Sequence, residues 1–339
     1  MKKLGVIILN WNGIELLKEF LPTASKHTIS DEADLIVADN GSTDGSVDWI
    51  RENHPEVKVL ELGENYGFAE GYNRAIDALD YPYVVLLNSD VEVTPDWWRP
   101  LLDLLEKNPG IGAVQPKILS YKDRGAFEYA GAAGGYIDAL GYPWCRGRLF
   151  DRLERDEGQY DGAPVEVAWA SGACLAMPSE LYRRSGGLDT RFFAHMEEID
   201  LCVRIRRAGL KVAAISDSAV YHVGGASLNQ GNPKKTYLNF RNNLLLLHKN
   251  LPQGKGKRIL LLRRLADTLA FGMNLLKGDV PNAKAILKAH SDFRKMRKEY
   301  RELPAEDIFP LLPGTDRYAV TARYLLGKKT LEPKKENHL

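Results

Sequence analysis

The stretch Val37-Ala38-Asp39-Asn40-Gly41-Ser42-Thr43-Asp44 joins a short apolar run to a cluster of small polar residues. The run at 34–39 has the length and composition of a buried strand, whereas residues 43–53 have helical spacing. The same alternation continues on both sides, with strands expected at 5–9, 57–62, 83–87 and 112–118 and helices at 13–26, 67–79 and 95–108. Strands that alternate with helices in this way predict a doubly wound, mostly parallel α/β sheet.

Residues 119–164 interrupt this alternation with a segment rich in glycine, aromatic and charged residues. Long ordered loops are usually lids or binding loops, so we expect this insertion to contact a ligand. The alternation resumes with an apolar run at 172–177, a helix at 197–208 and a strand at 210–215. From Lys234 onward the spacing is mainly helical. We therefore expect one α/β domain at 1–230, which includes the insertion, and a helical extension at 231–339.

The chain has 339 residues, of which 44% are hydrophobic and 27% charged, and this is the composition of a soluble globular protein. Its charge is unevenly distributed: residues 1–230 carry 23 basic and 35 acidic side chains, whereas residues 231–339 carry 23 and 10. Such a basic region can meet a nucleic acid or an anionic membrane, or dock on the acidic region. Three cysteines without a Cys-x-x-Cys pair indicate a reducing, cytosolic compartment.

Two segments of the basic extension bear on membrane contact. The apolar residues of 260–276 are interrupted by Arg263, Arg264 and Asp267, so this segment is not expected to span a bilayer. A second apolar stripe recurs at helical spacing among basic residues and consists of Ile286, Phe293, Met296 and Tyr300. This helix could lie on an anionic membrane, or it could pack on the rest of the protein with a solvated basic face. The pattern allows both interpretations.

Polar residues follow two of the expected strands at the point where each strand ends. In an open parallel sheet, ligands bind outside the carboxyl ends of the strands. Asp39 could accept a hydrogen bond from a base or ribose, and Asp90 with Asn88 could hold a hard divalent cation. The structural alternatives are a helix cap at Asp44 and ordinary turn chemistry at Asp39-Asn40-Gly41.

Three glycines, Gly63, Gly67 and Gly71, lie at the junction between the third strand and its helix. Their spacing differs from the Gly-x-Gly-x-x-Gly of dinucleotide sites. They could admit a diphosphate to backbone amides, or simply allow tight packing of the helix on the sheet.

The later segment 197–204 carries several acidic residues at helical spacing. Asp200 and Arg204 are placed to pair on a helix, which leaves Glu198 free for chemistry. Acidic residues in a first turn are also what a helix dipole favours.

Five segments taken in this order resemble the family 2 glycosyltransferases with a GT-A type fold, and most closely their bacterial rhamnosyltransferase-type branch. They extend over roughly residues 4–225. The segments are Val6-Ile7-Ile8-Leu9-Asn10-Trp11-Asn12, Asp39-Asn40-Gly41-Ser42-Thr43-Asp44-Gly45-Ser46, Asn65-Tyr66-Gly67-Phe68, Asn88-Ser89-Asp90 and the block from Glu197 to Arg204.

This resemblance implies a catalytic domain at 1–230, with 119–164 as its acceptor or lid insertion, and roles for individual residues. Glu198 would be the catalytic base. Asp90 would hold Mn²⁺ or Mg²⁺ with His222 of Tyr221-His222-Val223-Gly224-Gly225. The implied donor-binding residues are Asn10, Trp11, Asp39, Gly67, Gly71, Asn73, Asn88, Ser89 and Arg241. The implied acceptor-binding residues are Trp169, Gly172 and Glu197.

The sequence departs from the family pattern in three ways. The metal motif is Asn-x-Asp in place of Asp-x-Asp, and the base position has glutamate in place of aspartate. The Gln-x-x-Arg-Trp motif and the membrane helices of processive members do not occur. We therefore expect transfer of one sugar per encounter.

The expected function is inverting, metal-dependent transfer from dTDP-rhamnose or a UDP-hexose to a glycan or lipid-linked glycan acceptor in cell-surface polysaccharide synthesis. The expected location is the cytoplasm, with peripheral contact on the inner face of the plasma membrane. One alternative is a nucleotide-sugar-binding protein without turnover. Another is a nucleic-acid-binding protein, but the basic extension has no zinc-finger or RNP-type motif, so we expect no nucleic-acid partner.

Overall fold

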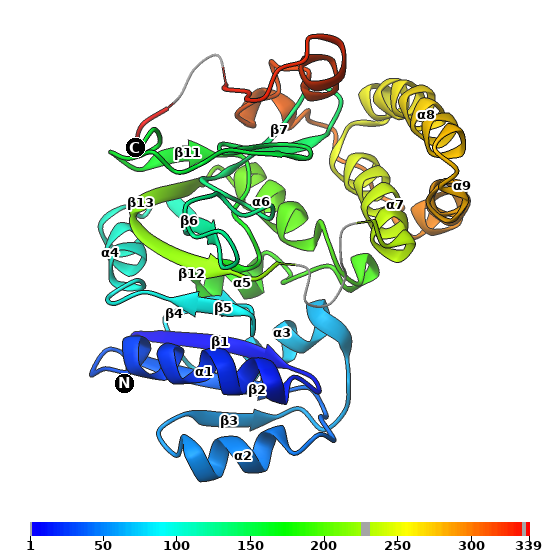
Figure 1. The fold of residues 1–339 in the computed structure, drawn as a ribbon. Helices are drawn as coiled ribbons and strands as arrows, with labels where there is room; N and C mark the ends of the chain where they lie inside the picture. Colours follow the sequence, from blue (N-terminus) through cyan, green and yellow to red (C-terminus); the bar gives the residue numbers. More distant parts are fainter. Residues whose placement is uncertain (1, 225–230, 334–336) are drawn as a thin grey trace.

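The parallel half of the central sheet contains the strands expected from the first 90 residues. The computed structural model describes residues 2–224, 231–333 and 337–339 (Figure 1). Strand β1 pairs in parallel with β2 and β4, and β2 pairs in parallel with β3. The four strands are β1 (Leu4–Asn10), β2 (Ala33–Asp39), β3 (Lys58–Glu61) and β4 (Tyr83–Leu87), which confirms the predicted ranges to within a residue or two.

The second half of the sheet is reached through one antiparallel strand. Strand β12 (Cys174–Pro178) lies antiparallel between β4 and β6 (Ile111–Ser120), so β6 runs in the same direction as β4. Strand β13 (Lys211–His222) pairs in parallel with β6, and the short strands β5 (Val91–Val93) and β11 (Val165–Val167) pair antiparallel with β13. The sheet is therefore mostly parallel, as the alternation predicted.

Helices cover both faces because the strands are apolar on both sides. Val6 and Ile8 pack in one core and Ile7 packs in the other, as the period of two in a strand requires. The first core holds α1 (Ile14–Thr28), α2 (Ser46–Asn53) and α4 (Arg99–Lys107), and the second holds α3 (Gly67–Ala78), α5 (Ser179–Arg184) and α6 (Glu197–Arg207). Helix α4 begins later than predicted, after a turn in which Asp96 has φ +54°.

The insertion at 119–164 contains a small four-stranded antiparallel sheet, whereas we expected a long loop. Its strands are β7 (Gly135–Ile137), β8 (Pro143–Cys145), β9 (Arg148–Leu149) and β10 (Arg152–Leu153). Tyr136 and Trp144 are buried and stack with ring centroids 4.6 Å apart. The segment has an apolar interior because its aromatic residues face the second core. Its role as an acceptor-binding lid stays a prediction.

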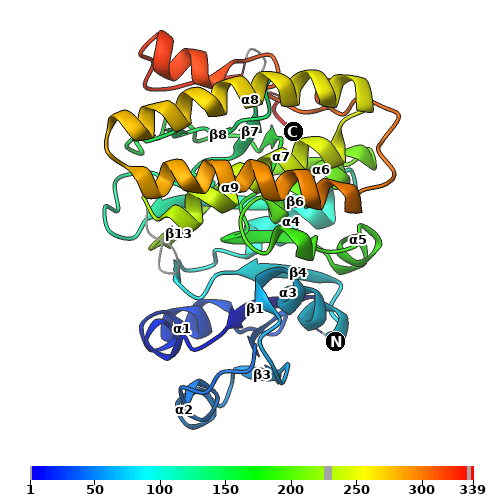
Figure 2. The same cartoon turned by 90° about the vertical axis from the view of Figure 1, so that its right-hand side faces the viewer.

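The C-terminal extension is mainly helical, as predicted. Helices α7 (Pro233–Asn250), α8 (Gln253–Leu276) and α9 (Val280–Met296) lie side by side (Figure 2). Short helical turns follow at η2 (Arg297–Glu299), η3 (Phe309–Leu311) and η4 (Thr321–Leu325), and another, η1 (Thr190–Phe192), precedes α6. The domain boundary that we predicted at residue 230 lies outside the described residues, as does Gly225.

The apolar stripe of α9 is packed against the protein. Ile286, Phe293 and Tyr300 are buried, and the Phe293 ring meets His248 of α7 edge to face at 6.0 Å. Of the two interpretations of this stripe, the packed one is therefore correct. Over the described ranges, no helix combines the length and the apolar character needed to cross a membrane.

Candidate active site

The ends of β1 and β2 form a hydrogen-bonded edge. Asn10 and Asp39 are register partners, and Asn10 Nδ2 donates to Asp39 Oδ1 at 3.1 Å. The backbone N–H of Ser42 donates to Asp39 Oδ2 at 2.9 Å. Both carboxylate oxygens of Asp39 are thus oriented by the protein, and each has lone pairs left for a ligand. The predicted nucleotide-binding residues Asn10 and Asp39 are brought together.

The segment after β1 leaves Trp11 at the rim of this edge. Asn12 has φ +48°, and its backbone N–H donates to Ser42 Oγ at 2.9 Å while its Oδ1 accepts from the N–H of Thr43 at 2.8 Å. These contacts hold the loop, and the Trp11 side chain is 56% exposed. Asp44 Oδ1 accepts from the N–H of Ser46, the first residue of α2, and its Oδ2 accepts from the N–H of Ile14, the first residue of α1, so Asp44 binds a backbone N–H at the start of two helices.

The residues predicted at the start of α3 have different surroundings. Asn40 Nδ2 donates to Gly67 O at 3.0 Å, and Gly67 has φ +77°, a conformation that favours glycine. Gly71 is packed so closely that a Cβ there would lie 2.9 Å from the Leu9 side chain. The Asn73 amide is used within the protein, because it donates to the carbonyl of Leu188 and accepts from its N–H, both at 2.9 Å. These contacts support the packing interpretation at Gly71 and Asn73.

Strand pairing brings the predicted metal residues together. Strand β5 begins directly after Asp90, and its first residue pairs with His222 at the end of β13. His222 Nε2 lies 3.1 Å from Asp90 Oδ1 and 3.4 Å from Asn88 Nδ2. On its other side, His222 Nδ1 lies 3.2 Å from Oε2 of Glu128, which is also buried. Ser89 lies in the turn between Asn88 and Asp90.

This arrangement favours the charged form of the His222 imidazole. Burial disfavours a charged imidazole, but the carboxylates of Asp90 and Glu128 raise the pKa of His222 to about 10. A cation would compete with the imidazole proton for Asp90 and Nε2. Within the described ranges, no group of three or more His, Cys, Asp or Glu residues forms a ready metal site. The metal role of Asp90 and His222 stays a prediction; these two residues would be two ligands, and phosphates and water would have to supply the rest.

The loop before α6 is conformationally strained. Phe193, His195 and Met196 have φ values of +67°, +68° and +75°, which side chains other than glycine rarely adopt. Such strain is concentrated at functional sites in proteins. Phe193 is 51% exposed, and its ring lies 3.9 Å from the position of a Cβ on Gly67. The loop therefore extends from the start of α6 to Gly67, at the start of α3.

Helix α6 begins with two glutamates that have unsatisfied oxygens. Oε2 of Glu197 and Oε2 of Glu198 are buried atoms without a hydrogen-bond partner among the described residues. Burial raises the pKa of Glu198 to about 7, and burial together with repulsion from Glu198 raises the pKa of Glu197 well above its usual value. A carboxylate with a pKa near neutral pH is suited to general-base catalysis.

A single turn connects Glu198 to the metal motif. The backbone N–H of Asn88 donates to Ala173 O at 3.0 Å, and a Cβ on Gly172 would lie 3.5 Å from the Cβ of Glu198. On the same turn, Ser171 Oγ donates at 2.6 Å to Ala130 O, two residues from Glu128. The predicted base Glu198 and Asn88 of the predicted metal motif thus both lie at the turn Ser171-Gly172-Ala173.

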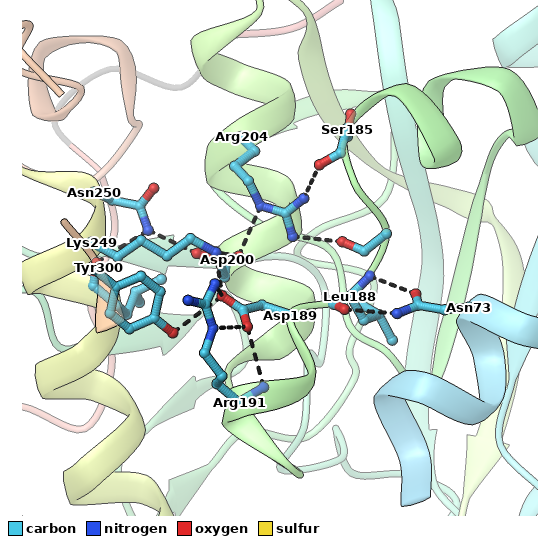
Figure 3. A network of polar contacts seen from close by, with 12 residues as sticks. Asn73, Ser185, Leu188, Asp189, Arg191, Asp200, Arg204, Lys249, Asn250 and Tyr300 are labelled. Carbon is cyan, nitrogen blue, oxygen red and sulfur yellow. Dashed lines mark hydrogen bonds and ion pairs between the residues drawn. The ribbon is translucent and has the colours of Figure 1, made fainter. Parts of the chain in front are cut away.

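The network in Figure 3 fixes α6 relative to the C-terminal helices. Asp200 is fully buried, and its oxygens accept from Arg204 Nε, Lys249 Nζ and Asn250 Nδ2, each at 2.8 Å. The pairing predicted between Asp200 and Arg204 is therefore present. Both carboxylate oxygens of Asp200 are hydrogen-bonded, whereas Glu198 and Glu197 each have an oxygen without a partner among the described residues.

Lys249 also joins Asp189 to this network. Lys249 Nζ donates to Asp189 Oδ2 at 2.7 Å, and Tyr300 OH donates to the same oxygen at 3.1 Å. Burial opposes ionisation of Asp189, but Arg191 and Lys249 hold the pKa of its carboxyl well below the usual range. The C-terminal extension is thus connected to the loop and helix that carry Glu198.

Two further predicted residues have structural contacts. Arg241 is buried, and its Nη2 donates to Phe192 O at 2.7 Å, so it supports the strained loop from behind. Trp169 is buried with its Nε1 donating to Tyr136 O at 2.9 Å. For both residues, direct ligand contact stays a prediction. A surface hollow of about 570 Å³ between α4 and β13 contains none of the predicted site residues.

Sequence reasoning missed Glu128 and Lys249. Glu128 lies in the insertion without a recognisable motif, and it is 94 residues from His222. Lys249 is one of many lysines in the basic extension. Only the preference of buried aspartates for a partner could have suggested that a distant lysine would meet Asp200.

Comparison with known proteins shows which family the chain resembles. Residues 5–157 match the glycosyl transferase family 2 domain. The chain is 29% identical over 242 residues to an N-acetylglucosaminyl-diphospho-decaprenol L-rhamnosyltransferase of Mycobacterium tuberculosis, which covers 65% of this chain and 75% of that protein. It is 25% identical over 247 residues to the low-salt glycan biosynthesis hexosyltransferase Agl10 of Haloferax volcanii, covering 71% and 74%.

The fold agrees with these matches. The crystal structure of GalNAc-T7 with UDP, GalNAc and Mn²⁺ superposes with a TM-score of 0.58 at 17% identity, covering 75% of this chain and 49% of that one. The structural neighbours have the GT-A fold, which confirms the predicted fold class. By its matching domain at residues 5–157, its relatives and its sheet, the chain is similar to the family 2 glycosyltransferases, and among them to a rhamnosyltransferase-like branch.

Proposed function

We propose that this enzyme transfers a single sugar from a nucleotide-diphosphate sugar to a lipid-linked glycan, with inversion at the anomeric carbon. The observation that carries the proposal is the position of Glu198, whose side chain lies against the turn that also binds Asn88 and whose Oε2 has no hydrogen-bond partner among the described residues. A base next to the donor edge is what a single displacement requires. The name of the mycobacterial relative supports a diphosphate-linked lipid acceptor and an L-rhamnosyl donor.

The donor would lie along the carboxyl ends of β1, β2 and β4. Asp39 and Asn10 would bind the nucleoside, and the exposed Trp11 ring would cover it. The N-terminus of α3 at Gly67 and the backbone near Ser89 would face the diphosphate, since helix N-termini favour anions. We propose dTDP-rhamnose first and a UDP-hexose second as donors.

Asp90 and His222 fit a divalent cation by the chemistry of their donor atoms. A buried carboxylate oxygen and an imidazole nitrogen lie 3.1 Å apart at the ligand edge, and Asn88 could add its amide oxygen. Two protein ligands with phosphates and water are a usual set for Mg²⁺. When bound, such an ion would offset the charge that grows on the departing diphosphate.

The remaining chemistry belongs to the chain itself. Glu198 Oε2 would accept the proton of the acceptor hydroxyl while the hydroxyl oxygen bonds to the anomeric carbon. The bond from that carbon to the diphosphate oxygen breaks in the same step, so the configuration at the anomeric carbon is inverted. The strained loop at 193–196 and the Asp200 network would hold Glu198 in place during this transfer. Phe193, exposed beside the donor edge, would contact the acceptor sugar.

The proposal is tested by incubating the protein with dTDP-rhamnose or UDP-glucose, Mn²⁺ and a synthetic diphosphate-linked N-acetylglucosamine lipid. Formation of a disaccharide lipid with inverted anomeric configuration, read by NMR, is the expected result. A product with retained configuration would contradict the single displacement. Release of sugar only to water would contradict the proposed acceptor class.

A further inference from the structure

The outer face of α8 exposes large apolar side chains along most of the helix. Their spacing of four, four, four and three residues places them on one side of the helix. We call this set the α8 stripe; it consists of Leu261, Leu265, Leu269, Met273 and Leu276, which are 61%, 61%, 71%, 47% and 90% exposed. An exposed apolar row of this length is unusual on a soluble protein surface and marks an interaction site.

The opposite side of α8 is held firmly by polar contacts, so its orientation is defined. Arg263 and Asp267 are buried, the Arg263 guanidinium lies 3.6 Å from the centroid of the Tyr142 ring, and Asp267 Oδ2 is 2.9 Å from His290 Nε2. Two of the three charged residues that interrupt the apolar run of 260–276 thus face inward, whereas Arg264 and the leucines are exposed. Figures 1 and 2 show α8 at the outside of the molecule, beside α7 and α9.

The exposed charges around the stripe are cationic. Lys257, Arg258, Arg264 and Lys277 are exposed and form no ion pair with any described carboxylate. The one acidic residue of α8 is the buried Asp267. A second copy of the chain docking through this face would therefore place like charges together, which is unfavourable. An anionic bilayer offers both an apolar layer and negative headgroups.

The C-terminal end of the α8 stripe lies toward the strained loop at residues 193–196. Asn282 Nδ2, in the first turn of α9, donates at 2.9 Å to the carbonyl of Gly231, two residues before α7. Three residues further on, Lys234 Nζ lies 5.4 Å from the centroid of the exposed Phe193 ring. The C-terminal end of α8, with the 90% exposed Leu276, thus lies on the side of the molecule that presents Phe193.

We propose that the α8 stripe and its exposed basic residues form a docking surface for an anionic membrane. This inference rests on the proposed function, because a lipid-linked acceptor remains in a bilayer while its sugar enters the site. Insertion of the leucines would supply apolar contact, and the four basic residues would supply attraction to the surface. The apolar stripe of α9, which is packed inward, takes no part.

Vesicle flotation of the full chain tests the surface. The protein should float with vesicles of equal parts phosphatidylcholine and phosphatidylglycerol, remain at the bottom with pure phosphatidylcholine, and detach in high salt. The double substitution Leu265→Glu and Leu269→Glu should reduce binding by more than about tenfold, because it inserts charge into the apolar layer. Arg264→Gln should reduce binding about fivefold.

Leu153→Glu is the matched control, since Leu153 is a 45% exposed leucine in β10, outside the extension. It should leave flotation unchanged. Equal loss with Leu153→Glu, or no binding of the unaltered protein to the anionic vesicles, would overturn the proposal. A dimer in solution that the Leu265 and Leu269 substitutions dissociate, without vesicle binding, would assign the stripe to a second copy and overturn it as well.

Donor hydrolysis in solution separates this inference from the proposed function. Release of nucleotide from dTDP-rhamnose or UDP-glucose should be the same for the unaltered protein and the double variant, because α8 does not touch the site. If the protein hydrolyses a donor but binds no vesicle, the docking surface fails and the glycosyltransferase function stands. If it binds vesicles but never consumes a donor, the docking surface stands and the proposed glycosyltransferase function fails.

Discussion

Replacing Glu198 with glutamine should stabilise the folded protein at alkaline pH and remove most of its turnover. The usual pKa of glutamate is 4.5, and burial raises that of Glu198 to about 7. One pKa unit corresponds to about 1.36 kcal/mol, so ionised Glu198 costs up to about 3 kcal/mol of folding free energy. This figure is an upper bound, because the side chain keeps some contact with water.

The direction of this pH dependence follows from the ionisation of Glu198 in the folded and in the unfolded chain. Well below pH 4.5 the carboxyl is protonated in both the folded and the unfolded chain, so the substitution changes little. As the pH rises from 4.5 through about 7, the unfolded chain ionises first, and the native protein loses stability. Glutamine cannot ionise, so the advantage of Glu198→Gln should grow over this range and reach its full value above it.

Urea unfolding at acidic and at alkaline pH measures the change in stability, and single-turnover assays measure the loss of turnover. Turnover should fall by about 10² to 10⁴, the range for a lost general base, with donor affinity kept. Glu180→Gln, an exposed glutamate in the first turn of α5, is the matched control and should change neither quantity. A stability gain that is the same at both pH values would refute the raised pKa of Glu198. Near-normal turnover of Glu198→Gln would assign the role of catalytic base to Glu197 instead.

Three further predictions concern the metal residues and the helix network. Asp90→Ala should abolish Mn²⁺-dependent nucleotide-sugar binding in calorimetry with the fold intact, and His222→Ala should weaken it less; undiminished affinity of Asp90→Ala would remove its metal role. Glu128→Gln should lower Mn²⁺ affinity, measured by EPR, by about 10- to 100-fold by releasing the His222 ring, and an unchanged affinity would count against this orientation. Lys249→Met should cost about 3 kcal/mol of unfolding free energy because it leaves buried carboxylates without their partner, whereas Lys288→Met, at an exposed ion pair, should cost much less; equal losses in urea unfolding would contradict the network.

The predictions from local patterns were the accurate ones. The strands β1, β2 and β4 and the helices α1, α3 and α6 lie within two or three residues of their predicted ranges, because hydrophobic period and turn residues are local signals. Asp39 and Asp90 could be placed at a ligand edge for the same reason, since parallel strands present their ends together. The ends of elements were less accurate, as in α4 and β13.

The sequence by itself determined the alternating sheet, the polar strand ends and the free glutamate at the start of α6. Only the tertiary structure decided which distant residues complete the site, because contacts such as Glu128 with His222 or Lys249 with Asp200 join residues 94 and 49 positions apart. It also decided which amphipathic helix faces outward. The stripes of α8 and α9 both have helical spacing, and only packing against α7 buries one and leaves the other on the surface, since periodicity identifies an apolar face without identifying what covers it.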